Sequence, residues 1–442
     1  MDKLILDNKT ALVLGWEFPP RMVGGLAVAT YGIVEALRHN IHVILILPYK
    51  NEQTPQLENV TIYGLNEVEQ YFPYEQVISL MRQKRHYLSS THQVHYYPNV
   101  VAHNKTETFN SAESLSISTT ATSYSLYDVF QSEEVYGWSL WKKLDAYVDI
   151  VSVLCEYLEF DLVHSHDWLT YKAGIHIKQR FNKPLVIHVH ALETDRVGPQ
   201  AKNEIFELEK KAIVEADVVM PVSEYTKGQI IRYYINYPDK IVPIHNAVEK
   251  ETVKRWKHKI PEKIVTFLGR ITVQKGPEYL LETISKVVKK FPQVKFVVAG
   301  KGDMLAPLIS SSAYQGLSRY VIFAGFLKRP EVNALLSTSD VYFMPSVSEP
   351  FGLTALEAAH FQVPCVLTKQ SGAAEVLSAA LKADYWDTDL FAKHIISILK
   401  DEKLSARIVK QSNDDLKKIS WHNSANKIAV EYNKIIRDKG KK

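Results

Sequence analysis

The chain alternates short apolar strands with helices, and this alternation starts twice. In the first half, the apolar segments 11–14 and 41–47 flank a helix that begins at Gly25. Near-continuous apolar strands separated by helices are typical of a parallel sheet that is covered on both faces. A polar stretch that ends in Pro261 interrupts the pattern, and segment 264–268 restarts it. The sequence therefore predicts an α/β protein with two doubly wound parallel sheets in tandem.

The restart also suggests where the domains lie. We expect an N-terminal domain over residues 1–248 and a C-terminal domain over residues 249–419, because 442 residues suffice for two separate cores. Residues 50–137 are polar and show little periodicity, so we interpret them as an irregular insertion. The last segment, 420–442, has a helical pattern. Sheets of this kind bind ligands beyond the carboxyl ends of their strands, which predicts a cleft between the domains.

Composition excludes several classes of protein. The net charge of +4 is small for this length and gives no reason to expect a nucleic-acid partner. Cys155 and Cys365 lie in apolar runs, as buried thiols of a reducing compartment do. No secretory signal and no apolar run of transmembrane length is visible, so the expected location is the cytoplasm. We expect the basic end, 437–442, to be solvated, with peripheral contact to an anionic membrane as the alternative.

One local string points to chemistry: Glu349-Pro-Phe-Gly-Leu-Thr-Ala-Leu-Glu357, which follows the apolar segment 341–345. It predicts a turn and then a helix, with the first carboxylate in the turn and the second on the helix. The first amides of a helix lack intrahelical partners, and the helix dipole favours an anion beside them. We therefore predict a phosphate at the helix start, with one carboxylate beside it and the other placed to bind a sugar hydroxyl.

This string resembles the Glu, seven residues, Glu element of retaining nucleotide-sugar glycosyltransferases that have two Rossmann-like domains, the GT-B class. The class includes glycogen, starch and sucrose synthases and many bacterial polysaccharide and lipid glycosyltransferases. The resemblance also implies that the last helix, within segment 420–442, crosses back to the N-terminal domain. The resemblance implies that Glu349 lies against the donor sugar and that Glu357 binds the ribose hydroxyls. The alternative is a well-started helix with a solvated glutamate, which would not require Pro-Phe-Gly-Leu after the first acid.

A glycine pair, Gly24-Gly25, follows the first strand after two prolines that prevent a helix. Glycines at a helix start let the backbone approach a ligand, although a plain tight turn would explain them as well. The longer string resembles the Gly-Gly-Leu loop of glycogen and starch synthases. Those enzymes carry a diphosphate-binding lysine where this chain has Met22, with Arg21 adjacent as a partial substitute. The departure favours the broader relatives over a strict glycogen synthase.

Two His-x-His pairs end neighbouring strands: His164 with His166, and His188 with His190. Such pairs suit zinc, as in metal-dependent amidohydrolases, but that class requires a single eight-stranded barrel. We therefore expect no metal site, and buried hydrogen-bonded histidines explain the pattern. His166-Asp-Trp resembles the His-Asp-Trp of glycogen synthase relatives. The resemblance implies that His166 reaches the donor sugar and stabilises charge at the reacting centre; the alternative is a core histidine.

Arg270 and Lys275 follow the first strand of the second domain, five residues apart. The guanidinium supplies a fork and the ammonium a point charge, so both can bind one diphosphate. Fixed cations there stabilise the negative charge that grows on the leaving group as the sugar bond breaks. The string resembles the Gly-Arg and Lys-Gly element of the family, which implies that no metal ion is needed. The alternative is a pair of surface cations.

The resemblance thus implies a glycosyltransferase that moves a hexose, expected to be glucose from UDP or ADP, to a glycan acceptor such as an α-glucan. It assigns catalytic roles to His166, Glu349, Arg270 and Lys275, and donor-binding roles to Gly24, Gly25, Arg270, Lys275, Leu327, Phe351, Gly352, Leu353, Thr354 and Glu357. Arg21, Asn246 and Gly372 complete the set at positions where the family pattern is only partly kept.

Other functions stay open on the sequence alone. A polysaccharide-linked or lipid-linked acceptor is the alternative within the same reaction. A sugar-nucleotide epimerase or a non-catalytic nucleotide-sugar sensor would share the architecture. The sequence contains neither a Walker A string nor Gly-x-Gly-x-x-Gly after a strand, which disfavours an NTPase or a dehydrogenase. The acceptor and the oligomeric state do not follow from the sequence.

Overall fold

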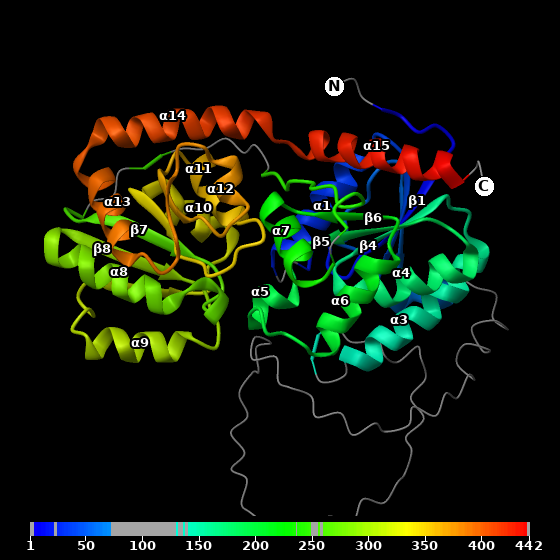
Figure 1. Ribbon diagram of the computed structural model, residues 1–442, viewed down its shortest axis with the longest axis horizontal. Helices are drawn as coiled ribbons and strands as arrows, with labels where there is room; N and C mark the ends of the chain where they lie inside the picture. Colours follow the sequence, from blue (N-terminus) through cyan, green and yellow to red (C-terminus); the bar gives the residue numbers. More distant parts are fainter. Residues whose placement is uncertain are drawn as a thin grey trace, which may run out of the picture.

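The computed structural model describes residues 4–21, 24–71, 130, 136–137, 140–235, 237–248, 255–256 and 260–439. It consists of two lobes, each built on a parallel sheet (Figure 1). The N-terminal sheet has the strand order β3-β2-β1-β4-β5-β6 and the C-terminal sheet the order β12-β11-β10-β7-β8-β9. This arrangement confirms the predicted α/β architecture with two doubly wound sheets.

The N-terminal lobe forms because apolar strands are buried under amphipathic helices. Its strands and helices are β1 (Thr10–Leu14), α1 (Gly25–Leu37), β2 (His42–Leu47), β3 (Val60–Gly64), α3 (Leu140–Leu154), β4 (Leu162–His166), α4 (Trp168–Phe181), β5 (Leu185–Val189), α5 (Glu193–Val197), α6 (Glu204–Glu215), β6 (Val218–Pro221) and α7 (Glu224–Tyr233). Local capping fixes some of the ends: Asn203 accepts from the Phe206 amide at the start of α6, and Ser223 accepts from the Thr226 amide at the start of α7.

The C-terminal lobe repeats the scheme around a second core. Its strands and helices are β7 (Lys263–Leu268), α8 (Pro277–Lys290), β8 (Val294–Ala299), α9 (Leu305–Tyr314), β9 (Val321–Gly325), α10 (Arg329–Thr338), β10 (Val341–Met344), α11 (Leu353–His360), β11 (Cys365–Thr368), α12 (Ala373–Val376), β12 (Leu381–Ala383), α13 (Thr388–Lys400) and α14 (Glu402–Lys418). The last helix, α15 (Trp421–Lys439), follows and belongs to the N-terminal core. Short 3-10 turns are η1 (Leu65–Gln70), η3 (Cys155–Tyr157) and η4 (Val273–Lys275).

Two edge strands depart from the sequence-based expectation. Strand β3 lies within the segment 50–137, which we expected to be irregular throughout, and β12 was not expected at all. Both are edge strands, and their side chains are largely half-exposed, so neither presents the continuous apolar run that marks a central parallel strand. Most of the remaining segment lies outside the described residues.

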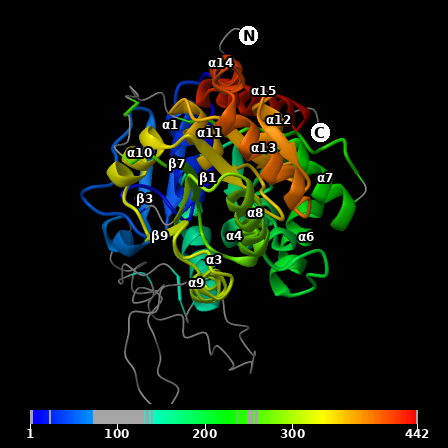
Figure 2. The ribbon, with the colours of Figure 1, turned by 90° about the vertical axis from the view of Figure 1, so that its left-hand side faces the viewer.

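The last helix, α15, packs against α1 of the first lobe. Gly32 of α1 makes this approach feasible, because a Cβ there would come within 2.3 Å of the Trp421 ring. Tyr432 of α15 is fully buried in the N-terminal core together with Ile33. In Figures 1 and 2, α14 and α15 run along the same edge of the molecule and connect the two lobes. No helix among the described residues is long and apolar enough to cross a bilayer.

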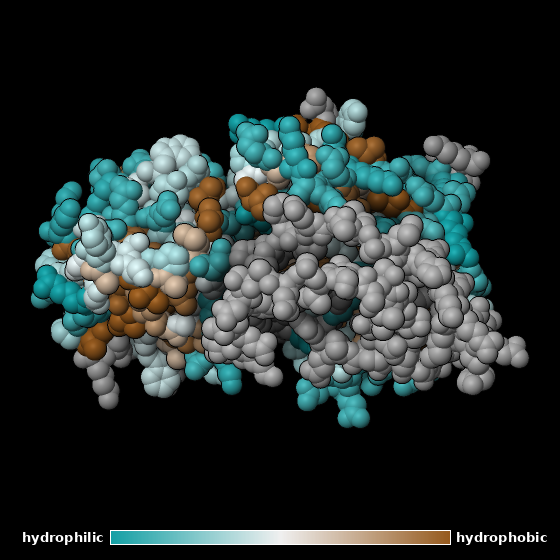
Figure 3. Space-filling model, turned by 90° about the horizontal axis from the view of Figure 1, so that it is seen from below, coloured by the Kyte–Doolittle hydropathy of each residue, from teal (hydrophilic) through white to brown (hydrophobic). Residues whose placement is uncertain are grey.

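Seen from below, the C-terminal lobe shows an apolar patch on the side where Figure 1 places α9 (Figure 3). Three large apolar residues of this lobe are exposed: Ile309 of α9, Ile322 of the edge strand β9 and Phe326. Arg319 is the one charged residue in segment 304–326. Phe326 follows the carboxyl end of β9, which ends at Gly325.

Candidate active site

The two lobes touch through the Glu349 loop. The Ser223 hydroxyl at the start of α7 donates to the Pro350 carbonyl at 2.6 Å, and Ser348 donates a short hydrogen bond to the buried carboxylate of Asp195 in α5. The Tyr225 hydroxyl lies 2.8 Å from the Ser348 hydroxyl. The residues just before and after Glu349 therefore contact the N-terminal lobe directly.

The two predicted phosphate-binding backbones face one another. A Cβ built on Gly25, at the start of α1, would lie 3.6 Å from the Leu353 side chain at the start of α11. Gly24 precedes α1 in extended conformation. The start of a helix carries unpaired first amides and the positive end of its dipole. Two helix starts from different lobes therefore converge where the sequence predicts the diphosphate.

Glu349 is held on both its backbone and its side chain. Its amide donates to the Gln370 carbonyl at 3.0 Å, and its carbonyl accepts from the Gly372 amide at 3.1 Å. Its carboxylate, which is largely buried, forms an ion pair with Lys275 and accepts from the Ser346 hydroxyl at 3.3 Å. The structure thus brings together Lys275 and Glu349, two residues that the sequence placed 74 positions apart.

Gly352 explains why this loop needs a glycine. Its φ is +93°, in the left-handed region, and a Cβ would lie 3.2 Å from Glu349 Cγ and 3.2 Å from Ala373 Cβ. The next residues, Leu353 and Thr354, form the first turn of α11 and are half-buried, whereas Phe351 is buried. The backbone conformation at Gly352 therefore sets the direction in which α11 leaves the loop.

Glu357 lies on α11 one turn further on and forms an ion pair with Arg329 of α10. Its side chain is 16% exposed and that of Arg329 is 50% exposed, so the pair sits at the surface of the lobe. Arg270 lies two residues beyond the end of β7 and is exposed. Lys275 is the last residue of η4. Gly276 follows it with a φ of +66° and is the N-cap residue of α8.

The four predicted histidines form one cluster: His164 and His166 lie on β4, His188 lies on β5, and His190 directly follows β5. His166 is paired in register with His188, and the two rings stack with centroids 5.2 Å apart. His166 Nδ1 lies 3.1 Å from His190 Nε2, and His164 Nδ1 lies 2.6 Å from the Tyr432 hydroxyl. Burial lowers the pKa of His164 to about 3, and burial together with the neighbouring rings lowers the pKa of His166 and His188 well below its usual value. The rings are therefore neutral at physiological pH.

An acidic group that the sequence analysis missed lies beside His166. Asp167 has a φ of +64°, a strained value for a residue other than glycine, and burial raises its pKa to about 6 against the opposing charge of Arg196. Glu17 accepts a short hydrogen bond from the Tyr136 hydroxyl. One signal for Glu17 was available: it is a lone acid between Trp16 and Phe18.

The structure also places the other residues that the sequence predicted for the site. Asn246 is buried, and its Oδ1 has no hydrogen-bond partner in the described part of the chain. The Arg21 guanidinium stacks over the Tyr49 ring at 4.0 Å, whereas Met22, the position of the missing lysine, lies outside the described residues. Gly372 packs tightly, since a Cβ there would lie 2.6 Å from the Pro350 carbonyl oxygen. Leu327 is half-buried at the end of the β9 segment.

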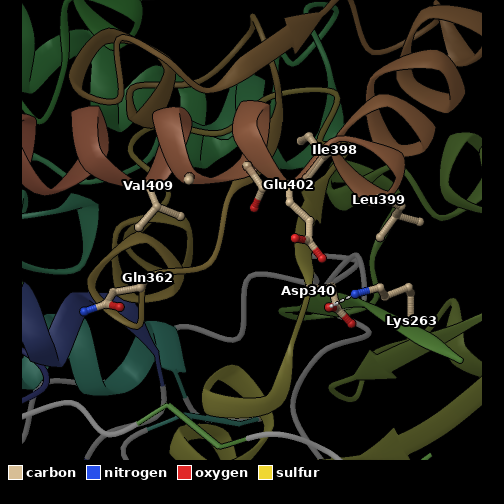
Figure 4. A pocket seen from close by; sticks show the side chains of 9 residues that line it. Lys263, Asp340, Gln362, Ile398, Leu399, Glu402 and Val409 are labelled. Atoms are coloured by element: carbon tan, nitrogen blue, oxygen red, sulfur yellow. Dashed lines mark hydrogen bonds and ion pairs between the residues drawn. The ribbon is translucent and has the colours of Figure 1, made fainter. Parts of the chain in front are cut away.

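A separate hollow of about 210 Å³ lies at the opposite end of the C-terminal sheet (Figure 4). Lys263 begins β7, and it forms an ion pair with Asp340, the residue before β10; both line the hollow together with residues of α13 and α14. Ligands of doubly wound sheets bind at the carboxyl ends of strands. This hollow lies at the amino ends, so we assign it no part in the site.

Comparison with known proteins agrees with this geometry. The family model described as Glycosyltransferase Family 4 matches residues 78–252, and the model described as Glycosyl transferases group 1 matches residues 249–415. An uncharacterized glycosyltransferase of Methanocaldococcus jannaschii is 27% identical, with 96% of this chain and 97% of that protein covered. A glycogen synthase of Mycobacterium tuberculosis is also 27% identical, but over 49% of this chain and 54% of that protein.

Solved structures share the fold at low identity. The sucrose-phosphate synthase of Thermosynechococcus elongatus superposes with a TM-score of 0.70 at 17% identity, covering 97% of this chain and 100% of that chain. A trehalose-6-phosphate protein of E. coli, solved with UDP-2-fluoro glucose, gives a TM-score of 0.63 at 13% identity and covers 96% of this chain and 99% of that chain. Both therefore share the overall fold of this chain.

Proposed function

Because the chain is a glycosyltransferase of the GT-B class, we propose that it transfers a hexose, glucose, from UDP or ADP to a glycan acceptor with retention of configuration. The observation that carries the proposal is the convergence on one space of two helix starts, at Gly25 and Leu353, with the Lys275–Glu349 pair beside the second. An E. coli protein of the same fold has been solved with a UDP sugar, which supports a nucleotide-sugar donor here.

Each group in this space has a task that its chemistry suits. Glu357 binds the ribose hydroxyls, for which an ionised carboxylate is a strong acceptor. Arg270 and Lys275 bind the diphosphate, together with the amides near Gly25 and Leu353. Donor binding adds a second anionic partner for Lys275, which is already paired with Glu349. The fixed cations stabilise the leaving diphosphate most when its charge is greatest, which is in the transition state.

The sugar end of the site lies between the lobes. We assign Glu349 to the donor sugar, and His166 to the stabilisation of positive charge at the reacting carbon. The departing phosphate oxygen accepts the proton of the acceptor hydroxyl, so transfer on one face requires neither an enzymic nucleophile nor a metal ion. The contacts of Ser348 with Asp195 and Tyr225 support a closed arrangement that excludes water from this space.

The acceptor is an α-glucan in the first hypothesis. The Gly-Gly-Leu and His-Asp-Trp strings support it, as does the glycogen synthase similarity over half of the chain. A polysaccharide-linked or lipid-linked acceptor is the second hypothesis, favoured by Met22 at the family lysine position.

A donor and acceptor screen tests the proposal. Purified protein is incubated with UDP-glucose, ADP-glucose, UDP-N-acetylglucosamine or GDP-mannose, with and without maltooligosaccharide and with EDTA present, while nucleoside diphosphate release is followed. Release that depends on both a glucose donor and the glucan is the expected result. Slow release without any dependence on the glucan would select the second acceptor hypothesis. Absence of both nucleotide binding and turnover would reject the proposal.

Two variants separate an enzyme from a nucleotide-sugar sensor. Glu349→Ala and His166→Ala are expected to abolish transfer while nucleotide binding, followed by calorimetry, is kept. His394→Gln, on α13 of the C-terminal lobe, is the matched control and should transfer normally. Undiminished transfer in both site variants would contradict the assigned roles.

A further inference from the structure

The histidine cluster contains more nitrogen atoms than the protein satisfies. His164, His166 and His188 are fully buried on neighbouring strands, with ring centroids 4.5 to 5.4 Å apart. His190 stacks on His188 at 4.6 Å and is the most exposed of the four. Both His-x-His pairs therefore place their rings on one side of the sheet, at the carboxyl ends of β4 and β5.

The unsatisfied atoms follow a pattern. In His164 and His166 the Nδ1 atom has a partner, Tyr432 and His190 respectively, and in both rings the Nε2 atom has none in the described part of the chain. Both nitrogens of His188 also lack a partner there. Buried polar atoms without partners are rare in folded proteins and indicate an ion or water at the site. Metal-binding histidines typically show this division, with one ring nitrogen on the metal and the other on a supporting group.

We propose that His164 and His166, through Nε2, and His188, through a ring nitrogen, bind one divalent transition-metal ion of the zinc class. One ring nitrogen from each of the three residues lies within 4.8 Å of the other two. Zinc–nitrogen bonds are about 2.0–2.1 Å long, so binding brings the three nitrogens within about 4 Å of one another. A set of neutral imidazoles suits zinc, whereas Ca²⁺ and Mg²⁺ take oxygen ligands.

The proposed metal site differs from what the sequence predicted. We expected no metal there because the chain lacks the eight-stranded barrel of metal-dependent amidohydrolases. A three-histidine set requires only neighbouring strands with ligands on one side, and β4 and β5 supply them. The set includes His166, which the proposed function places at the donor sugar. If the proposed function holds, a bound ion inhibits transfer, because the His166 ring that binds the ion is no longer available to the donor sugar.

Metal uptake by the untagged wild-type chain tests the site without any donor. Protein stripped with a chelator and dialysed is titrated with Co²⁺, and then with Zn²⁺, while the visible Co²⁺ bands are recorded. One equivalent of Co²⁺ with intense bands, displaced by one equivalent of Zn²⁺, is the expected result. No saturable uptake would overturn the proposal. This readout is independent of turnover, so it fails or succeeds separately from the proposed function.

Variants and spectroscopy locate the ion. His188→Gln is expected to weaken Co²⁺ binding by at least about 100-fold, whereas His394→Gln binds as the wild type does. Equal binding by His188→Gln and wild type would overturn the assignment. X-ray absorption of the zinc-loaded wild type keeps the test independent of how the variant folds: three imidazole ligands are expected, and coordination dominated by carboxylate or sulfur would contradict the site.

Discussion

Lys275 and Glu349 form an ion pair between two loops at the carboxyl end of the C-terminal sheet, both with largely buried side chains. The proposed diphosphate would share this lysine. Lys275→Ala is expected to reduce transfer by about 100- to 1,000-fold, because it removes a fixed cation from the charge of the transition state. Lys275→Arg keeps the charge and should lose less. Steady-state rates with the best donor measure both, and Lys286→Ala on α8 is the control. Turnover within about twofold of wild type in Lys275→Ala would remove the lysine from the mechanism.

Glu357 is expected to affect donor affinity rather than the chemical step. In Glu357→Gln the neutral amide replaces a carboxylate that binds the ribose hydroxyls, and hydrogen bonds to charged groups contribute about 1.5–3 kcal/mol. The donor KM should therefore rise by about 10- to 100-fold with kcat little changed, as for an interaction made equally in ground and transition states. Glu278→Gln, an exposed position on α8, should leave KM unaltered. A collapse of kcat at constant KM would instead place Glu357 at the reacting centre.

Local patterns predicted the parts of this site that lie within one stretch of chain. Gly352 and Glu357 could be placed at a helix start and on its flank because both belong to the string that forms the loop and α11. The sequence predicted that Lys275 and Glu349 both follow strands of the second sheet. It did not predict that their side chains form an ion pair. The central strands were predictable for the same reason, since a buried parallel strand is a continuous apolar run.

Contacts between the lobes could not be predicted in this way. Asp195 lies in a five-residue helix, and its partner Ser348 is 153 positions away. No periodicity relates such residues, because their proximity depends on how the two sheets are oriented. Glu17 is a different case. A buried acid next to a tryptophan in an apolar string must be compensated by a partner, so the residue could have been flagged even though Tyr136 could not have been named.

The contact between α1 and α15 gives a prediction about stability. A Cβ on Gly32 would overlap the Trp421 ring, so Gly32→Ala is expected to lower the free energy of unfolding by about 1–3 kcal/mol. Gly228→Ala, in α7, is a matched control because a Cβ there meets no atom within 4 Å. It should be neutral or stabilising by up to about 1 kcal/mol. Urea denaturation of both variants and wild type measures the difference. Equal stability of Gly32→Ala and wild type would show that α15 does not pack closely on α1 in solution.

Glu209, buried in α6, predicts how stability depends on pH. Burial raises its pKa to about 8, although Arg196 and the Tyr234 hydroxyl oppose the shift. A carboxyl group with a raised pKa holds its proton more tightly in the folded chain than in the unfolded chain. Its contribution to stability is therefore full below about pH 4.5 and is lost as pH rises toward about 8.

Glu209→Gln removes this titration while it keeps a polar side chain of similar size. The wild type should lose stability between pH 5 and pH 8, and Glu209→Gln should show a smaller loss over the same range. Thermal unfolding at pH 5, 6.5 and 8 measures both slopes, with Glu207→Gln, on the same helix, as the control expected to follow the wild type. If Glu209→Gln has the wild-type slope, the carboxylate is ionised throughout. The Arg196 guanidinium, 3.1 Å away, then outweighs the cost of burying the charge.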